Sequence, residues 1–207
     1  MNLLIVAATE FEIKPLQDQN LEADYLITGV GIPATIFHLT KKLMAKNYNL
    51  AFQVGIGGSF KDSMPPGDVV LIKEDAFGDL GIEENGKLKT LFETGFAGKD
   101  DFPYEDGLLI NRGLLLEKID LPKARAITVN KVMDGQIQID NNKERFNADI
   151  ESMEGAAFHY VCIQQKINFL QMRGISNQVG ERDKAKWKMK TAIENMNNEV
   201  LKIIKNL

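Results

Sequence analysis

The stretch Leu3-Leu4-Ile5-Val6-Ala7-Ala8-Thr9-Glu10-Phe11-Glu12 gives the clearest indication of the fold. Its first part is entirely apolar, which is typical of a strand that a sheet buries on both faces. Residues 9–12 then indicate the start of a helix, because acidic side chains are favourable in a first helical turn. A buried strand followed directly by a helix is the repeating unit of an α/β fold.

The same alternation of strand and helix recurs along the chain. Apolar spacing predicts helices over residues 34–46, 154–165 and 184–207, strands over residues 25–28, 50–54, 69–72, 125–129 and 167–175, and a short edge strand over residues 148–152. Residues 75–124 are predicted to be mostly loops, with one amphipathic helix at 111–119. The pattern favours the α/β class. We expect a three-layer α/β/α fold whose central layer is a mixed, mainly parallel twisted sheet.

Composition limits the classes of function. The chain has 207 residues, of which 44% are hydrophobic, so we expect one sizeable core and a single domain over residues 1–207. The net charge is −4, and acidic and basic residues are interspersed, which favours small-molecule partners over nucleic acid or a membrane. The sequence shows neither a signal peptide nor an apolar run long enough to span a bilayer, so we expect a soluble cytoplasmic protein.

Two glycine-rich stretches follow predicted strands. Gly29-Val30-Gly31 and Gly55-Ile56-Gly57-Gly58 would let main-chain N–H groups approach a ligand, although each is equally typical of a tight turn. Neither matches a dinucleotide fingerprint or a P-loop, so we expect no NAD, no ATP and no other cofactor. His38 and His159 have no cysteine or carboxylate at ligand spacing, and we predict no metal site.

Two further stretches place polar side chains where a ligand could reach them. In Ser152-Met153-Glu154-Gly155-Ala156 a carboxylate stands at a helix start beside residues too small to shield it, although it could simply complement the helix dipole. Arg173-Gly174-Ile175-Ser176-Asn177 ends a predicted core strand, and α/β sheets bind ligands at the carboxyl ends of strands. Spacing alone leaves open whether this second stretch is a site or a turn.

Taken in order along the chain, these stretches and Ala8-Thr9-Glu10-Phe11-Glu12 resemble the nucleoside phosphorylase and nucleosidase superfamily over nearly the whole length. Within it, residues 176–183 followed by Trp187 are most similar to the futalosine hydrolases, which take part in menaquinone biosynthesis. The resemblance implies an enzyme that cleaves the N-glycosidic bond of a purine nucleoside. It also implies a homo-oligomer.

The resemblance further implies roles for particular residues. Glu12 matches the glutamate that deprotonates the attacking water, and Met153 and Glu154 match the pair that contacts the ribose. Arg173 and Ser176 match residues that frame the water and the base pocket. The remaining substrate-binding candidates are Thr9, which replaces a frequent methionine, and the glycine-rich residues Ile56 and Gly57.

Asn177 departs from the nucleosidases that release adenine, which have an aspartate at the matching position. An amide N–H can donate to O6 of a departing hypoxanthine while the amide oxygen accepts from N7–H, which favours a 6-oxopurine and makes Asn177 a catalytic candidate. With its roles reversed, asparagine can also pair with adenine. Methylthioadenosine or S-adenosylhomocysteine cleavage therefore remains an alternative, and a non-catalytic nucleoside-binding protein is a second.

Other parts of the predicted site stay open. Ile32-Pro33-Ala34 supplies neither a hydroxyl nor a cation for phosphate, which favours water as the nucleophile. Val132 or Met133 could form the wall beside the base. The candidates for binding a carboxylate on the far arm of the substrate are Arg182, Lys184 and Arg112.

Overall fold

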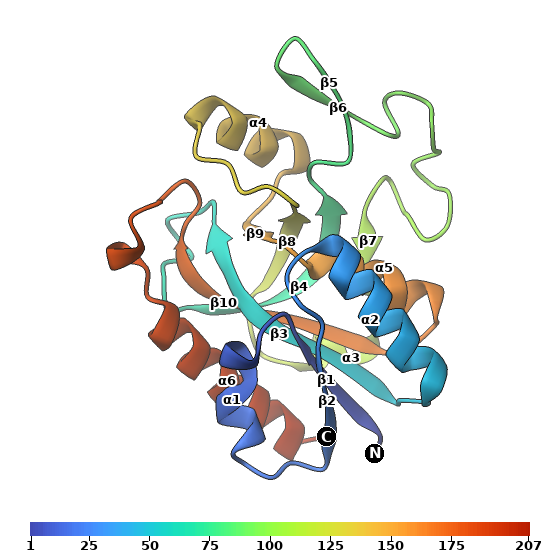
Figure 1. Ribbon diagram of the computed structural model, residues 1–207, viewed down its shortest axis with the longest axis vertical. Coiled ribbons are helices and arrows are strands. Elements are labelled where there is room, and N and C mark those ends of the chain that lie inside the picture. Colours follow the sequence, from blue (N-terminus) through green and yellow to red (C-terminus); the bar gives the residue numbers. More distant parts are fainter.

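A central sheet of eight strands forms the middle layer of the protein, which the computed structural model describes over residues 1–207 (Figure 1). The strands are β1 (Leu3–Ala7), β2 (Ala23–Ile27), β3 (Leu50–Ser59), β4 (Val69–Phe77), β7 (Leu109–Ile110), β8 (Lys123–Thr128), β9 (Ile150–Ser152) and β10 (Phe169–Gln178). Five strand pairs of this sheet are parallel and three are antiparallel. The prediction of a mixed, mainly parallel sheet is confirmed.

Helices cover both faces of the sheet. They are α1 (Glu10–Gln17), α2 (Ile32–Ala45), α3 (Leu114–Lys118), α4 (Gln136–Phe146), α5 (Gly155–Gln164) and α6 (Met189–Lys205), with a 3₁₀ turn at Lys184–Lys186. Figure 1 shows α1 and α6 on one side of the sheet and α2 and α5 on the other. The predicted three-layer α/β/α arrangement is therefore confirmed.

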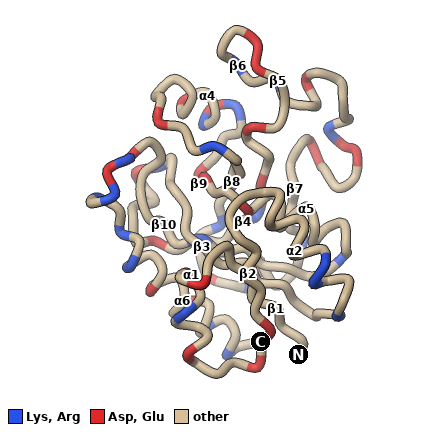
Figure 2. The backbone as a smooth tube through the Cα atoms, in the orientation of Figure 1, with Lys and Arg blue, Asp and Glu red and all other residues tan.

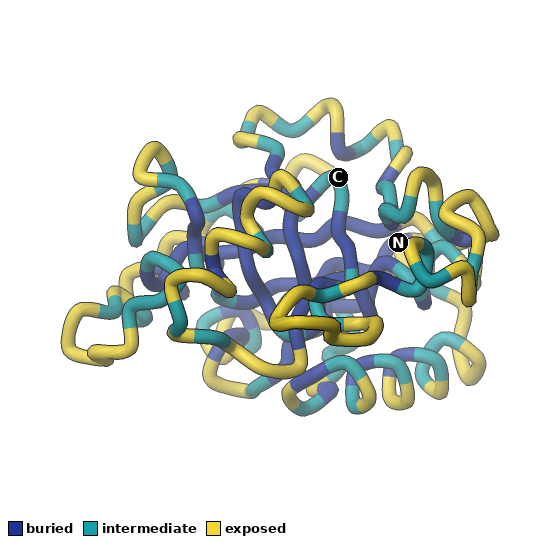
Figure 3. The backbone as a smooth tube through the Cα atoms, turned by 90° about the horizontal axis from the view of Figure 1, so that it is seen from above, coloured by how far each residue is buried: buried dark blue, intermediate teal, exposed yellow.

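Strand β1 shows why the sheet needs both layers. Leu3 and Ile5 pack into the core beneath α1, α3 and α6, whereas Leu4 and Val6 pack into the core beneath α2 and α5. Successive side chains of a strand point to opposite faces, so a wholly apolar strand must be covered twice. Figure 3 shows the result, with buried strands inside and exposed loops and outer helix turns around them.

Strand β3 has a central position and organises the region that matters most below. It pairs with β10 along one edge, while its other edge pairs with β1 over Leu50–Gln53 and with β9 at Gly58–Ser59. The chain of pairings β3–β10–β4–β8–β9–β3 closes into a ring. An opening therefore lies where β1 ends and β9 begins to pair, at the kind of strand divergence where α/β sheets bind ligands.

Some predicted boundaries are wrong. Residues 55–59 continue β3 instead of forming a loop, because β10 pairs with the strand over this whole stretch and β9 pairs with it at Gly58–Ser59. Residues 148–152 do not form an edge strand, since β9 lies between β8 and β3. Helix α6 begins at Met189, after the 3₁₀ turn, and α4 was not predicted.

Residues 75–124 contain more regular structure than predicted. Strand β4 extends to Phe77, and β5 (Gly81–Glu84) pairs with β6 (Lys87–Thr90) as a separate hairpin. The helix expected at 111–119 covers only Leu114–Lys118.

The charged residues are distributed evenly along the chain. Lysine and arginine alternate with aspartate and glutamate over the backbone, without a block of one sign (Figure 2). None of the helices combines the length and the apolar character needed to cross a membrane.

Candidate active site

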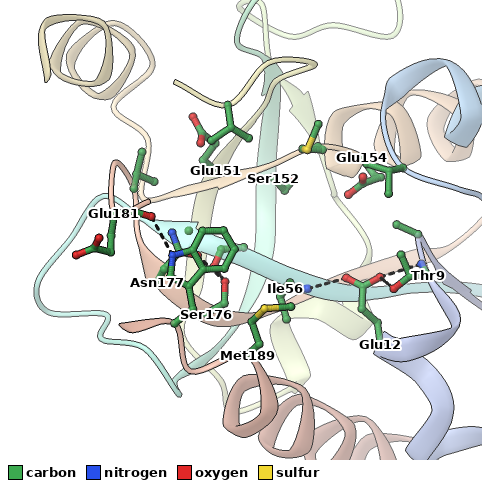
Figure 4. A pocket seen from close by; sticks show the side chains of 18 of the residues that line it. Thr9, Glu12, Ile56, Glu151, Ser152, Glu154, Ser176, Asn177, Glu181 and Met189 are labelled. Carbon is green, nitrogen blue, oxygen red and sulfur yellow. Dashed lines mark hydrogen bonds between the residues drawn. The ribbon is translucent and has the colours of Figure 1, made fainter. Parts of the chain in front are cut away.

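A cavity of about 400 Å³ opens where β1, β3, β9 and β10 meet (Figure 4). Its size is in the range of small-molecule sites. Figure 4 shows Thr9, Glu12 and Glu154 toward one end of the cavity and Glu151 and Asn177 toward the other. We call these the carboxylate end and the amide end.

Glu12 is held rigidly at the carboxylate end. Oε2 accepts hydrogen bonds of 3.0 Å from both the main-chain N–H and the hydroxyl of Thr9, in a capping box at the start of α1. Oε1 accepts a 3.1 Å bond from the N–H of Ile56 on β3. Asn197 of α6 donates a 2.9 Å bond to the Glu12 carbonyl oxygen, so the main chain is fixed as well. The carboxylate therefore faces the cavity in one orientation.

Glu154 lies at the same end of the cavity as Glu12, directly before α5 (Figure 4). Its Oε1 accepts a 2.9 Å hydrogen bond from the N–H of Gly31, which precedes α2. Burial raises the pKa of Glu154, although the nearby guanidinium of Arg173 opposes this increase. Met153 lines the cavity beside it. The first residues of α5 are Gly155 and Ala156, which leave the carboxylate accessible.

Arg173 does not reach the cavity lining, contrary to its expected place beside the water. It is almost fully buried on β10, where it pairs with Gly55 and donates a 2.9 Å hydrogen bond to Gln53. A Cβ atom on Gly55 would lie 2.4 Å from Nη1 of Arg173 and 2.9 Å from Oε1 of Glu12. Only glycine leaves room there for the guanidinium to approach Glu12 from behind. Arg173 is thus a buried positive charge beneath the carboxylate end.

At the amide end, hydrogen bonds fix the orientation of Asn177. The hydroxyl of Ser176 lies 3.1 Å from the carbonyl of Gly57 and 2.7 Å from Oδ1 of Asn177, while Nδ2 of Asn177 donates a 2.8 Å bond to the carbonyl of Gln178. A carbonyl can only accept, so the atom facing Gln178 must be the amide nitrogen. One N–H and one acceptor position of the amide stay available to a ligand.

This arrangement of strands and polar side chains matches a known family. The sequence model of the phosphorylase superfamily matches residues 21–205. The chain belongs to the phosphorylase superfamily. Two relatives within reach of sequence comparison are the futalosine hydrolases of Thermus thermophilus, 28% identical over 87% of this chain and 80% of that protein, and of Streptomyces coelicolor, 27% identical over 87% and 77%.

Solved structures of the superfamily share the fold of this member. The 5′-methylthioadenosine/S-adenosylhomocysteine nucleosidase of Neisseria meningitidis, solved with methylthio-immucillin-A, superposes with a TM-score of 0.83 at 17% identity and covers 100% of this chain and 99% of that one. The futalosine hydrolase of Helicobacter pylori gives the same TM-score at 14% identity, over 100% and 98%. At these identities, the likeness shows the common architecture.

The cavity of this superfamily member brings together most of the residues singled out from its sequence. Every one of the candidates except Arg173 lines it, namely Thr9, Glu12, Ile56, Gly57, Met153, Glu154, Ser176 and Asn177. Of the two wall candidates, Val132 lines the cavity and Met133 does not. Of the three cationic candidates, Arg182 lines it and Lys184 does not, and Arg112 is exposed and pairs with Glu105.

Sequence reasoning missed several lining residues. Trp187, in the segment between β10 and α6, and Met189, the first residue of α6, both line the cavity. The indole N–H of Trp187 donates a 2.9 Å bond to the carbonyl of Glu181 and so fixes this segment. Glu151 also lines the cavity and was not predicted. Its position directly before the Ser152-Met153-Glu154 stretch was the available signal.

Proposed function

We propose that this chain hydrolyses the N-glycosidic bond of futalosine, releasing hypoxanthine and dehypoxanthinylfutalosine. The observation that carries the proposal is the presence of two side chains of fixed orientation in one cavity. The carboxylate of Glu12 lies at one end and the amide of Asn177 at the other (Figure 4). The relatives named futalosine hydrolase support the choice of substrate.

Glu12 is suited to activate water. Its two oxygens are oriented by donors from Thr9 and Ile56, and a carboxylate has further lone pairs with which to accept a proton from water. In the proposed reaction the water oxygen bonds to C1′ of the ribose, the bond from C1′ to the purine nitrogen breaks, and Glu12 takes the water proton. The departing purine takes a proton from solvent.

Glu154 is suited to the ribose. Its Oε1 is held by the N–H of Gly31, and the free oxygen can accept hydrogen bonds from the 2′ and 3′ hydroxyls. Glycosidic cleavage passes through a sugar with growing positive charge, and a nearby carboxylate stabilises that charge. Burial strengthens this effect because the local dielectric is low.

Water fits the carboxylate end better than phosphate does. The N–H of Gly31, which could otherwise contact an anion, is already bound to Glu154. The next residues, Ile32 and Pro33, begin α2 without a hydroxyl or a cation. Of the lining residues only Arg182 is cationic, and it follows Glu181 near the amide end. Two carboxylates and no facing cation favour a neutral nucleophile.

A direct assay tests the reaction. Purified protein is incubated without phosphate with futalosine, inosine, methylthioadenosine or S-adenosylhomocysteine, and the released base is identified by chromatography. Hypoxanthine from futalosine supports the proposal. Release of adenine from methylthioadenosine or S-adenosylhomocysteine, without cleavage of futalosine, would favour the alternative nucleosidase activity. Release of a base only after phosphate is added would show that water is not the nucleophile.

Changing Asn177 to Asp is expected to shift the base preference. A carboxylate lacks the N–H that would bind O6 of hypoxanthine, and it would face the Gln178 carbonyl at the 2.8 Å position now occupied by Nδ2. We expect kcat/KM for futalosine to fall about 10- to 100-fold relative to methylthioadenosine, as measured on both substrates. An unchanged ratio would contradict the role assigned to the amide.

We also propose that the chain acts as a homo-oligomer of single-domain subunits. Val30, in the loop that binds Glu154, and Phe37, on the helix α2 that follows this loop, are large apolar residues that are more than half exposed. Exposed apolar side chains grouped near a site are typical of a protein interface. Light scattering during gel filtration should give a mass at least twice the 23.2 kDa of one chain, and Phe37→Glu should lower it.

A further inference from the structure

Glu151 is a buried carboxylate without a partner. It lies on β9 with 7% of its surface exposed, and it lines the cavity. No hydrogen bond or salt bridge within the chain holds either of its oxygens, although neighbouring carboxylates such as Glu12 and Glu154 are held in this way. Burying a charged group without a partner is costly, so such a group usually serves a ligand.

The surroundings of Glu151 disfavour the ionised form of its carboxyl group. Burial raises the pKa of its carboxyl to about 7, the negative charge of Asp79 adds to the increase, and Arg182 opposes it. The fraction of ionised carboxylate therefore grows as the pH rises through about 7. A ligand that donates a hydrogen bond to it would compensate for the lost hydration.

Strand register places Glu151 opposite Asn177. Gly58 of β3 pairs with Glu151 on β9 at one edge and with Asn177 on β10 at the other. Residues paired in register project to the same face, and neighbouring strands lie about 5 Å apart, so the two Cα atoms are about 10 Å apart. Gly58 between them has no side chain, and a Cβ there would lie 3.0 Å from Cγ2 of Val179 and 3.4 Å from Nδ2 of Asn177, so Val179 covers this position.

A flat bicyclic base that lay against Val179 would have Asn177 at one edge and Glu151 at the other. When the amide of Asn177 hydrogen-bonds to N7 and O6 of the base, Glu151 faces the edge of the six-membered ring. A 6-oxopurine carries a hydrogen on N1, whereas adenine presents a lone pair there. A carboxylate attracts the first and repels the second.

We propose that Glu151 is a specificity-determining residue whose carboxylate accepts a hydrogen bond from N1–H of a 6-oxopurine and disfavours a 6-aminopurine. This inference rests on the proposed function and deepens it. The amide of Asn177 alone can pair with either base. Glu151 would distinguish them, because N1 of a 6-oxopurine is a hydrogen-bond donor and N1 of adenine is an acceptor.

The test is the binding of free bases, which requires no turnover. Hypoxanthine and adenine are titrated by calorimetry into the wild type, Glu151→Met and Glu151→Gln at pH 8, where the carboxylate is ionised. We expect the wild type to prefer hypoxanthine, and Glu151→Met to lower that preference about 10- to 100-fold. Glu151→Gln keeps one acceptor oxygen and should retain an intermediate preference.

A matched control distinguishes specificity from general disturbance. Glu74 lies on β4 outside the cavity, where its carboxylate pairs with Arg125, so Glu74→Gln should leave the preference unchanged. Melting temperatures confirm that each variant is folded. If Glu151→Met does not fold, Glu151→Gln alone decides, because an undiminished preference in that variant overturns the inference.

The outcomes also separate this inference from the proposed function. A preference for hypoxanthine that disappears in Glu151→Met, in a protein that does not cleave futalosine, supports the inference and leaves another 6-oxopurine nucleoside as the substrate. Futalosine cleavage by a wild type that binds both bases equally would uphold the function and overturn the inference.

Discussion

Replacing Glu12 with Gln should lower kcat for futalosine by about 1,000-fold. An amide cannot take a proton from water at neutral pH, so the variant lacks the base. The substitution also affects the local hydrogen bonds, because both carboxylate oxygens accept from main-chain N–H groups, those of Thr9 and Ile56. An amide NH₂ must face one of these donors, which we expect to cost about 1–3 kcal/mol of folding free energy.

The measurement is single-turnover kinetics together with thermal unfolding. Glu10 provides the matched control, since it lies in the same first turn of α1 but is exposed, and Glu10→Gln should change neither quantity. Normal turnover in Glu12→Gln would exclude this glutamate as the base. A complete loss of folding would be inconsistent with the limited cost given above.

Replacing Glu154 with Gln should lower kcat/KM by about 100-fold. The amide oxygen can still accept the N–H of Gly31, so the loop before α2 stays in place. The negative charge beside the ribose is lost, and one acceptor for the ribose hydroxyls becomes a donor. The effect should therefore come from the charge of the transition state and not from displacement of the loop.

A substrate that lacks the ribose 2′ hydroxyl tests whether Glu154 contacts the ribose. The wild type should lose activity on the 2′-deoxy form of the nucleoside, because Glu154 then lacks one of its partners. Glu154→Gln should lose much less on the same change, as in a double-mutant cycle. Equal losses in both proteins would show that the carboxylate does not contact the ribose.

Much of the architecture could be predicted because burial leaves a pattern in the sequence. The apolar run of β1 and the spacing in α2 each follow from the faces that they bury. The error at residues 55–59 has a physical cause. Glycine usually indicates a turn, but Gly55 is in an extended strand because Arg173 and Glu12 occupy the space of a side chain. That contact joins residues 118 positions apart and leaves no local signal.

The candidate residues come from motifs in the sequence, and the two differences from the cavity lining, at Arg173 and Glu151, follow from strand register. Arg173 pairs with Gly55, and its side chain turns into the core, whereas Ser176 and Asn177 reach the cavity beyond an irregularity in the pairing of β10. Glu151 enters the cavity because it pairs with Gly58. Alternation along a strand can be inferred from sequence, but which residue lies opposite which cannot.

The hydrogen bond from Gly31 to Glu154 joins groups 123 positions apart, and the bond from Asn197 to Glu12 spans 185. Contacts between such distant segments form slowly and require the intervening chain to be in place. Glu12 therefore takes up its position only when the first and last helices have docked, and Glu154 only when the loop before α2 has reached the start of α5. Recovery of catalysis during refolding should follow complete assembly of the chain, and a fragment without α6 should be inactive even if its remaining strands pair.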